Sequence, residues 1–482
     1  MNEPLVPLAE GFEPATSEQW LALVAKTIGE AAFDDKLVSH TVDGLDILPL
    51  YPAAEAAEPI SMGPRDTHRP WDLRVRTAHP EPAAARAEIL ADLEGGAASA
   101  IIAIDPEGVS GVAVGSAEGL AGALDGVVLE LAPVALDAGF LGPKAADWLA
   151  AAAKSSPAAL LNFHLNPLGA LARTGVSPGP IESHLISAAT VAARLTETYP
   201  KAGLFLASGQ VVHEAGGGEA LELGFMAASV VVYAKALARA GVPAKDGLPR
   251  IVLGLAADAD YFVTIAKLRA ARRIFARIAG ALGCDVTPRI EARSSQRMLT
   301  TADPWTNMLR LTSAGFGAAV GGADAIVLGG FTDAIGLPTA LARRQARNAQ
   351  LVLMEEASLG RVADPAAGGG FLETLTDQLA RAGWAAFQSI ESEDGLVAAL
   401  SSGSIASEAQ TALERRLAAI QAKADKILGV TIYPNASQGE VKVETPTPSP
   451  VQAPSARLPG PDTVASPLRP VRLSEFFEEA RS

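Results

Sequence analysis

The chain has 482 residues, about half of them apolar and 19% charged, so it can bury a large core and is not wholly disordered. Its 54 acidic residues outnumber the 39 basic ones, which gives a net charge of −15. Nucleic acid would require a basic stripe and an anionic membrane a polybasic segment, so we expect neither partner. The single cysteine, Cys284, excludes an internal disulfide and a cysteine-rich metal site.

Two features of the sequence bear on its location. The N-terminus lacks the positively charged and apolar regions of a signal peptide. No uncharged apolar run reaches the about 18 residues that a transmembrane helix needs. We therefore expect a cytoplasmic protein without a membrane span.

Residues 1–60 are predicted to form an N-terminal arm. Apolar residues recur at helical spacing after Ser17, a candidate N-cap, at Trp20, Leu21, Val24 and Ile28. Residues 43–51 then predict a turn followed by an extended segment. Because this arm is too thin to bury a core of its own, it must pack on the rest of the chain or on a partner.

Residues 61–433 alternate between short apolar runs and longer Ala-rich helical stretches. Strands are predicted at residues 71–75, 99–104, 126–131, 158–163, 203–208, 250–255, 286–292 and 325–329. Helices are predicted between them at residues 81–93, 183–199, 219–240, 261–281 and 306–320. This alternation predicts a parallel sheet, and eight repeats favour an α/β fold closed into a (β/α)8 TIM barrel, although an open doubly wound sheet gives the same local pattern.

In such a barrel the chemistry lies in the loops that follow the strands, here near Gly209, Ala256, Arg293 and Gly330. A long helix over residues 408–428 is expected to follow the barrel. Residues 434–482 are rich in proline, with much Ser, Thr and Ala, and predict an extended C-terminal linker or arm without a core. It is interpreted as a tether or as an arm that wraps a partner.

Several segments match known motifs in order. Residues 297–310, RMLTTADPWTNMLR, are similar to LTxxDPxxNxxR, and residues 355–369 are similar to EExSxxxxVxDPxxGS. Upstream, residues 41–51 match TxDGxxxxPLY and residues 69–74 match RPWxxR. Over roughly residues 15–435 the chain resembles the methylmalonyl-CoA mutase family of adenosylcobalamin-dependent acyl-CoA mutases.

The resemblance implies how the cofactor is held. In this family the barrel holds the acyl-CoA along its axis, and a flavodoxin-like domain binds cobalamin through the histidine of a DxHxxG motif. This sequence contains no DxHxxG motif. We therefore expect that the chain has no cobalamin-binding domain and binds no cofactor itself, and that adenosylcobalamin belongs to a partner subunit.

The positions that are catalytic in the family depart from its pattern. Catalytic members carry SGYHxxEAG, whereas residues 208–216 read SGQVVHEAG, which places Gln210 at the Tyr position and Val211 at the His position. Valine has neither donor nor acceptor and cannot polarise a thioester carbonyl. His213 lies two residues on, and on an extended segment it would point to the same side as Val211, which leaves a remnant role as a lesser alternative.

Three further loops have lost polar groups. The RGPYPxMY loop, whose tyrosine lies over cobalamin, is represented by residues 62–68 without a tyrosine, and GTxQND by residues 161–169 without the glutamine. GGTQSLHTN is represented by residues 321–329, where the glutamine and histidine are replaced. This pattern resembles the non-catalytic small (β) subunit of heterodimeric bacterial members. These small subunits share the NPLGALxxTG motif that residues 166–175 contain.

Other motifs allow a plain interpretation. The pair His213-Glu214 has no companion at metal-ligand spacing, so we predict no metal site. The glycines at 216–218 precede a helix and could hold a phosphate, but without Lys and GxGxxG spacing a simple turn is favoured. Residues 293–295, Arg-Ser-Ser, follow a strand and could contact a CoA phosphate, yet hydrogen bonds that stabilise the fold are favoured. The arginines at 343, 344 and 347 share one side of a helix, which is typical of salt bridges, here with Glu355 and Glu356, although an anion patch is the alternative.

The resemblance leads to one main hypothesis for function. We expect a non-catalytic small subunit that stabilises a catalytic large mutase subunit in a heterodimer, with acyl-CoA and cobalamin acting through that partner. The complex would interconvert methylmalonyl-CoA and succinyl-CoA, and this chain alone would be inactive. The alternative is a catalytic barrel subunit that works with a separate cobalamin-binding chain. An unrelated barrel enzyme has no acid, base or nucleophile constellation to support it. Both arms are expected to lie against the partner.

Overall fold

A closed barrel of eight parallel strands lies at the centre of the molecule, in the order β10-β3-β4-β5-β6-β7-β8-β9. The computed structural model describes residues 11, 13, 15–29, 32–54, 59–63, 65–435 and 439–478. The barrel strands are β3 (Asp72–Thr77), β4 (Ser99–Ala103), β5 (Val134–Asp137), β6 (Leu161–Leu165), β7 (Gly203–Ser208), β8 (Ile251–Ala257), β9 (Arg289–Ser294) and β10 (Ala325–Val327). This confirms the predicted (β/α)8 TIM barrel.

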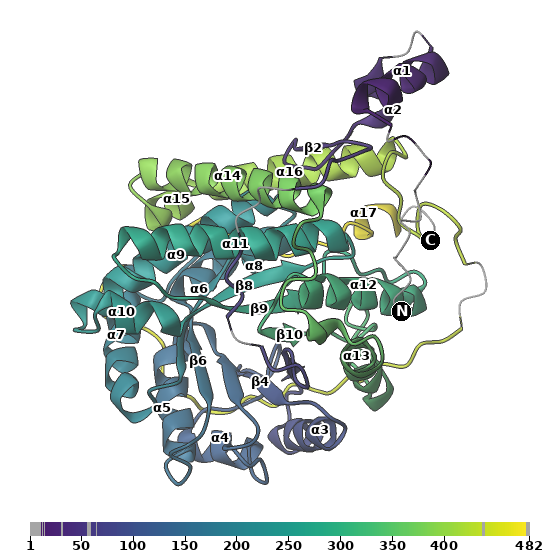
Figure 1. The fold of residues 1–482 in the computed structure, drawn as a ribbon. Helices are drawn as coiled ribbons and strands as arrows, with labels where there is room; N and C mark the ends of the chain where they lie inside the picture. The colour runs from purple at the N-terminus through teal and green to yellow at the C-terminus, as the bar shows by residue number, and fades with distance from the viewer. Residues whose placement is uncertain are drawn as a thin grey trace, which may run out of the picture.

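Helices surround the barrel (Figure 1). Those between and after the strands are α3 (Pro82–Glu94), α4 (Ala117–Ala123), α5 (Gly142–Ala152), α6 (Pro167–Thr174), α7 (Ile181–Thr198), α8 (Gln210–Glu214), α9 (Glu219–Arg239), α10 (Ala244–Gly247), α11 (Tyr261–Ala281), α12 (Asn307–Val320), α13 (Ala340–Leu351), α14 (Gly370–Ser392), α15 (Leu396–Ser402) and α16 (Ser404–Gln421). Short 3-10 or π turns are Gly139–Leu141, Leu248–Arg250, Pro304–Thr306, Val352–Glu356 and Leu359–Arg361. Several strands are buried along their whole length, which explains why they read as continuous apolar runs.

The strands predicted at 158–163 and 286–292 each begin three residues later, at Leu161 and Arg289, and three further predictions are wrong. The third barrel strand is β5, not residues 126–131, which form turns after α4 and leave Val128 and Leu131 exposed. Pro133 separates these two adjacent apolar runs, and the run after it enters the barrel. The helix expected over 408–428 is α16, which ends at Gln421. The N-cap of the first helix is Thr16 rather than Ser17.

The helix α9 packs between the barrel and α14, and close approach requires glycine there. A Cβ on Gly383 of α14 would lie 2.7 Å from the Leu223 Cβ of α9. By length and apolar composition α9 could cross a membrane, but 67% of its apolar stretch is buried inside this fold. Its hydrophobic sequence is therefore accounted for by the core.

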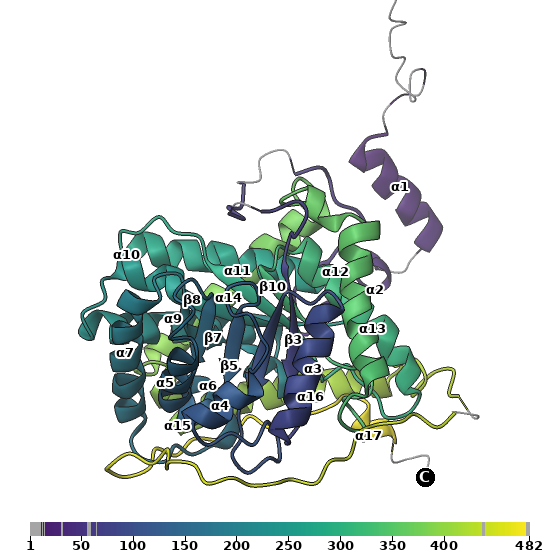
Figure 2. The same ribbon diagram turned by 90° about the horizontal axis from the view of Figure 1, so that it is seen from below.

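The N-terminal arm contains α1 (Ser17–Ile28), α2 (Phe33–Leu37) and a small hairpin of β1 (Ser39–His40) and β2 (Asp46–Ile47). Figures 1 and 2 both show α1 standing away from the barrel. None of the α1 side chains is buried in the part of the chain that the structure describes. Leu21 and Leu23 are 47% and 64% exposed. The outer half of the arm thus has an uncovered apolar surface.

Residues 439–478, here called the strap, follow the carboxyl-terminal end of the barrel and end in α17 (Glu475–Glu478) (Figure 2). Backbone N–H groups of the strap donate to carbonyls in the loops and short helices that follow five of the barrel strands, namely those of Leu337, Pro106, Pro178, Ala172, Glu214 and Arg297. The strap therefore packs on its own barrel, a contact that the sequence did not predict. Contact of either arm with a partner remains a prediction.

Candidate functional site at the barrel mouth

A cavity of about 460 Å³ opens at the carboxyl-terminal end of the barrel, where the site was predicted. Arg293 and Gly330 line it, together with Gln210 and Val211, which follow Gly209. Ala256 is buried and donates its N–H to Glu222 instead. Strap residues Leu468 and Pro470 close one side of the cavity.

The barrel interior below this cavity is filled by charged side chains. Arg74 of β3 donates to Glu291 of β9 at 2.5 Å and also pairs with Asp72. Glu291 in turn accepts from Nε of Arg293 at 2.7 Å. Burial opposes ionisation of Glu291, but Arg293, His164 and Arg74 hold its pKa well below the usual range. These groups are therefore ionised and paired over β10, which separates β3 from β9.

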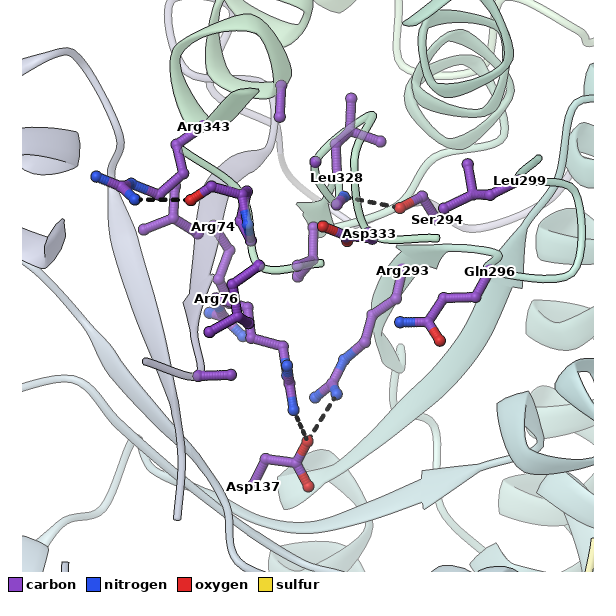
Figure 3. A pocket seen from close by; sticks show the side chains of 18 of the residues that line it. Arg74, Arg76, Asp137, Arg293, Ser294, Gln296, Leu299, Leu328, Asp333 and Arg343 are labelled. Carbon is purple, nitrogen blue, oxygen red and sulfur yellow. Dashed lines mark hydrogen bonds and ion pairs between the residues drawn. The ribbon is translucent and has the colours of Figure 1, made fainter. Parts of the chain in front are cut away.

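The chain of ion pairs continues to the mouth through Asp137, at the end of β5. Arg76 and Arg293 both reach Asp137 Oδ2, at 3.5 and 3.4 Å (Figure 3). Burial would raise the pKa of Asp137, but Arg293, Arg76 and Arg173 lower it to about 2. We call the connected set the ladder, and its members are Arg74, Glu291, Arg293, Asp137 and Arg76.

His164 of β6 lies beside the ladder, with Nε2 3.9 Å from the Glu291 carboxylate. Its backbone adopts a positive φ of 46°, which is rare for a residue with a side chain. Both ring nitrogens are buried and have no hydrogen-bond partner among the described residues. Burial lowers the pKa of His164 to about 4, so the imidazole is neutral near pH 7.

The segment with Gln210 and Val211 forms the short helix α8 rather than an extended strand. Residues two apart on a helix point to roughly opposite sides, because each residue turns by about 100°. Val211 lines the cavity, whereas His213 is fully buried, with Nε2 3.0 Å from Ser295 Oγ and Nδ1 3.3 Å from Glu222. The expectation that His213 and Val211 share a side is wrong, and the premise for a remnant role of His213 is lost.

Glu214 and Arg297, which lie in two of the segments that match the family's motifs, hold loops together beside α8. The Glu214 carboxylate accepts the N–H groups of Gln296 and Arg297. The buried Arg297 side chain pairs with Asp258 at 2.7 Å and with Glu219 at 3.3 Å. Burial would raise the pKa of Asp258, but Arg297 keeps it well below its usual range. These residues therefore link the loops after β7, β8 and β9.

The N-terminus of α9 is occupied by the arm. Asp43 of the TxDG motif accepts the N–H groups of Glu219 and Ala220, at 3.0 and 3.3 Å. A Cβ on Gly218 would meet Asp43 Oδ1 at 2.1 Å, so glycine is required for this approach. Burial raises the pKa of Asp43 to about 7, and the neighbouring Glu219 adds to the shift. A carboxylate of the chain itself thus fills the phosphate position considered above.

Comparison with known proteins gives this geometry its context. Residues 69–458 match the family model of methylmalonyl-CoA mutase. This chain belongs to the methylmalonyl-CoA mutase family. It is 38% identical to a methylmalonyl-CoA mutase small subunit of Streptomyces virginiae, over 98% of this chain and 77% of that relative. It is 33% identical to the small subunit of Propionibacterium freudenreichii subsp. shermanii, over 81% of this chain and 64% of the relative.

A relative from Cereibacter sphaeroides named simply methylmalonyl-CoA mutase is 27% identical over 88% of this chain and 65% of its own length. The predicted resemblance to the small subunits of the mutase family is therefore confirmed. Two of the three arginines on α13 form salt bridges as predicted, but with different partners, whereas Arg344 is exposed and forms no ion pair with the described residues. Arg343 pairs with Glu88 of α3 at 2.7 Å and Arg347 pairs with Asp92, rather than with Glu355 and Glu356.

The favoured interpretation of the loop after β9 also agrees with the structure, since its serines stabilise the fold. Ser294 Oγ accepts the N–H of Gly329 at 2.8 Å, and Ser295 bonds to His213. Among the residues that the structure describes, no group of three or more His, Cys, Asp and Glu side chains could hold a metal ion. The mouth of this mutase-family barrel is thus a cavity whose lining includes arginine and valine side chains. The serines beside it hold neighbouring loops in place.

Proposed function

We propose that this chain is the non-catalytic small subunit of a heterodimeric methylmalonyl-CoA mutase and that it stabilises a catalytic large subunit. The observation that carries the proposal is the ladder, which crosses the barrel axis where the family holds acyl-CoA. A thioester chain on this axis would have to separate Arg293 from Asp137, whose side chain is 40% exposed, and would then meet the buried pairs of Glu291 with Arg74 and Arg293. Breaking a buried pair costs about 3–5 kcal/mol, because an uncompensated charge remains, whereas a partly exposed pair costs less.

The cavity wall supports the same proposal. Val211 lies at the position where catalytic members place a histidine, and it offers no hydrogen bond to a thioester carbonyl. His213 is held by Ser295, and the neutral His164 lies beside the ladder. Asp333, whose pKa burial raises to about 7, also lines the mouth, but it comes from the loop after β10 and not from the position of the family's histidine.

The mouth residues do not fit adenosylcobalamin. His79 lines the cavity, but its Nδ1 accepts the N–H of Glu81 and its Nε2 faces Glu444 of the strap at 3.8 Å. Leu468 and Pro470 cover part of the same surface. We therefore assign the cofactor and its radical chemistry to the large subunit and derive no step through it here.

The exposed apolar side chains of Leu21 and Leu23 on α1 support contact between the N-terminal arm and that large subunit. An obligate heterodimer is expected to bury more than about 2,000 Å². We also propose a cytoplasmic location, which the single cysteine supports because a reducing compartment suits an unpaired thiol.

The test measures mutase turnover of methylmalonyl-CoA with adenosylcobalamin in three mixtures: the purified chain, the chain with a free-standing cobalamin-binding protein, and the chain with a large subunit. We expect turnover only in the third, and greater stability of the large subunit there than alone. Mass spectrometry must exclude a co-purified partner. Turnover in the second mixture would favour the alternative, a catalytic barrel subunit with a separate cobalamin-binding chain.

Restoring the motif sharpens this test. The double variant Gln210→Tyr with Val211→His is expected to stay inactive in the second mixture, because the ladder still fills the axis and catalytic groups act as a unit. Gain of turnover in that variant would show that these two positions are the whole defect and would contradict the role given to the ladder.

A further inference from the structure

The turn of the β1–β2 hairpin docks on the N-terminus of α9 through the side chain of Asp43. Its two carboxyl oxygens accept the backbone N–H groups of Glu219 and Ala220. Gly218 permits this approach, because a Cβ there would lie 2.1 Å from Asp43 Oδ1. Leu45 of the same turn packs against the barrel core. Docking of the arm therefore brings a carboxyl group into a buried helix end.

The Asp43 carboxyl meets a second carboxyl there, that of Glu219, and the two side chains are hydrogen-bonded to each other. Such a bond requires a proton on one of them, because an ionised carboxylate has no donor. Glu219 is the ionised partner, since Arg416 of α16 lies 3.0 Å from its carboxylate and Arg297 lies 3.3 Å away. In the docked arm the proton therefore lies on Asp43.

The groups that face this pair from the neighbouring elements carry more carboxyls than cations. Their permanent cations are Arg297, Arg416 and Lys267. His213 lies 3.9 Å from Glu219, and even its protonated form would leave the carboxyls in excess. These carboxyls are Asp43, Glu214, Glu219, Glu222, Asp258 and Asp260. The cluster therefore has no spare cation to neutralise an ionised Asp43.

Burial acts in the same direction. It raises the pKa of Asp43 to about 7, Glu219 adds to the rise, and Arg416 and the N–H of Ala220 oppose it. In a detached arm this carboxyl would be solvated, with the ordinary pKa of about 4. Docking of the turn therefore takes up a proton from solvent, and detachment returns it.

We propose that the N-terminal arm is a proton-controlled latch, in which the hairpin turn docks on α9 by taking up one proton at Asp43 and detaches when that proton returns to solvent. Acid favours the docked arm. The helix α1 precedes the hairpin, so the latch controls how closely α1 is held to the barrel. This inference goes beyond the proposed function, because it concerns the isolated chain and requires no partner.

Hydrogen–deuterium exchange of the full-length chain between pH 5 and pH 8 tests the latch, with rates corrected for the pH dependence of intrinsic exchange. The amides of Glu219 and Ala220 report docking directly, since Asp43 is their acceptor. Up to about pH 7 the docked turn holds one proton more than the detached turn, so docking should weaken about tenfold per pH unit. The protection of the two amides should fall roughly a hundredfold from pH 5 to pH 7 and level off by pH 8. The barrel strand β8 is the internal reference and should keep its protection.

Asp43→Asn distinguishes the latch from a plain anchor. An amide can accept the N–H groups of α9 and donate to Glu219 without a proton from solvent, so protection should stay high and independent of pH. His40→Gln is the matched control. His40 is an exposed titratable residue of the same hairpin, paired with Asp46 at 2.9 Å, and its replacement should leave the fall in protection unchanged.

A protection of the two amides that stays constant between pH 5 and pH 7 in the unmodified chain would overturn the inference. So would a fall that Asp43→Asn retains, a fall that His40→Gln abolishes, or amides that are unprotected at pH 5 in Asp43→Asn. The exchange experiment uses no partner and measures no turnover, so its failure is separate from a failure of the proposed small-subunit role.

Discussion

The two ends of this chain have similar sequence character but opposite structural roles. Both are thin, with scattered apolar residues and no core of their own. The strap is held against the barrel by backbone hydrogen bonds, and Ala465, Leu468 and Ser474 are buried. In α1 no side chain is buried within the described residues, and the arm is anchored further along, at Asp43.

The difference teaches how an extended segment becomes part of a fold. Proline is stiff and has no N–H, so a proline-rich strap loses less entropy on docking and carries fewer donors that need partners. The N–H groups that remain are placed opposite loop carbonyls at the barrel mouth. An amphipathic helix satisfies its own backbone instead, so its apolar side chains are left for another surface.

The largest expected effect comes from removing the strap. A chain that ends at Asn435 should lose about 3–5 kcal/mol of unfolding free energy, because burial of Leu468 alone contributes about 2 kcal/mol and each lost hydrogen bond about 1 kcal/mol. Deletion of residues 1–29 should cost less than about 0.5 kcal/mol. Urea unfolding followed by circular dichroism measures both, and equal midpoints for the two truncations would break the comparison.

The anchors of the two ends should respond to pH in opposite directions. Burial raises the pKa of Asp43 to about 7, so its stabilising contribution is greatest below about pH 4 and is lost as the pH rises through 7. Burial opposes ionisation of Glu478 as well, but N–H groups of Ala302 and Thr301 lower its pKa. Its contribution is therefore present above about pH 4.5 and is lost as the pH falls below that value.

Two charge-removing variants measure these slopes between pH 3 and pH 8. Relative to the unmodified chain, Asp43→Asn should gain about 1–2 kcal/mol of stability as the pH rises from 4 to 8. Glu478→Gln should be about 1 kcal/mol less stable at pH 8, and this deficit should shrink below pH 4.5. Parallel pH profiles for the two variants would contradict the assignment of opposite shifts.

Removal of one buried hydroxyl near the end of the strap should have a smaller effect on the unfolding free energy. Ser474 is buried and donates to the Leu299 carbonyl at 3.0 Å, so Ser474→Ala should cost about 1 kcal/mol. Ser455 lies in the exposed part of the strap, and Ser455→Ala should change the unfolding free energy by less than about 0.5 kcal/mol. A loss at Ser455 as large as that at Ser474 would mean that the strap is held evenly along its length.

The sequence predicted the barrel because strands buried on both faces read as unbroken apolar runs. It misplaced β5 because two such runs adjoin across Pro133, and only packing decides which one enters the sheet. The match to SGYHxxEAG placed Val211 in the site. No pattern in the sequence showed that residues 210–214 form the short helix α8, which directs His213 away from the cavity. The contacts of Asp137 with Arg76 and Arg293 join residues 61 and 156 positions apart, and sequence reasoning missed them because no local pattern encodes such pairings.

The smallest expected effect on the isolated chain comes from the exposed leucines of α1. Leu21→Ser combined with Leu23→Ser should change its unfolding free energy by less than about 0.5 kcal/mol, since neither side chain is buried. If the arm contacts a large subunit, the same double variant should weaken heterodimer assembly at least tenfold, because two apolar anchors would be lost from the interface. Lys26→Gln on the same helix provides a polar control that should leave assembly unchanged. Sedimentation with the large subunit measures the affinity. An unchanged affinity in the double variant would show that α1 does not contact the large subunit. The strap would then be a segment bound to its own barrel, and α1 a segment bound to neither subunit.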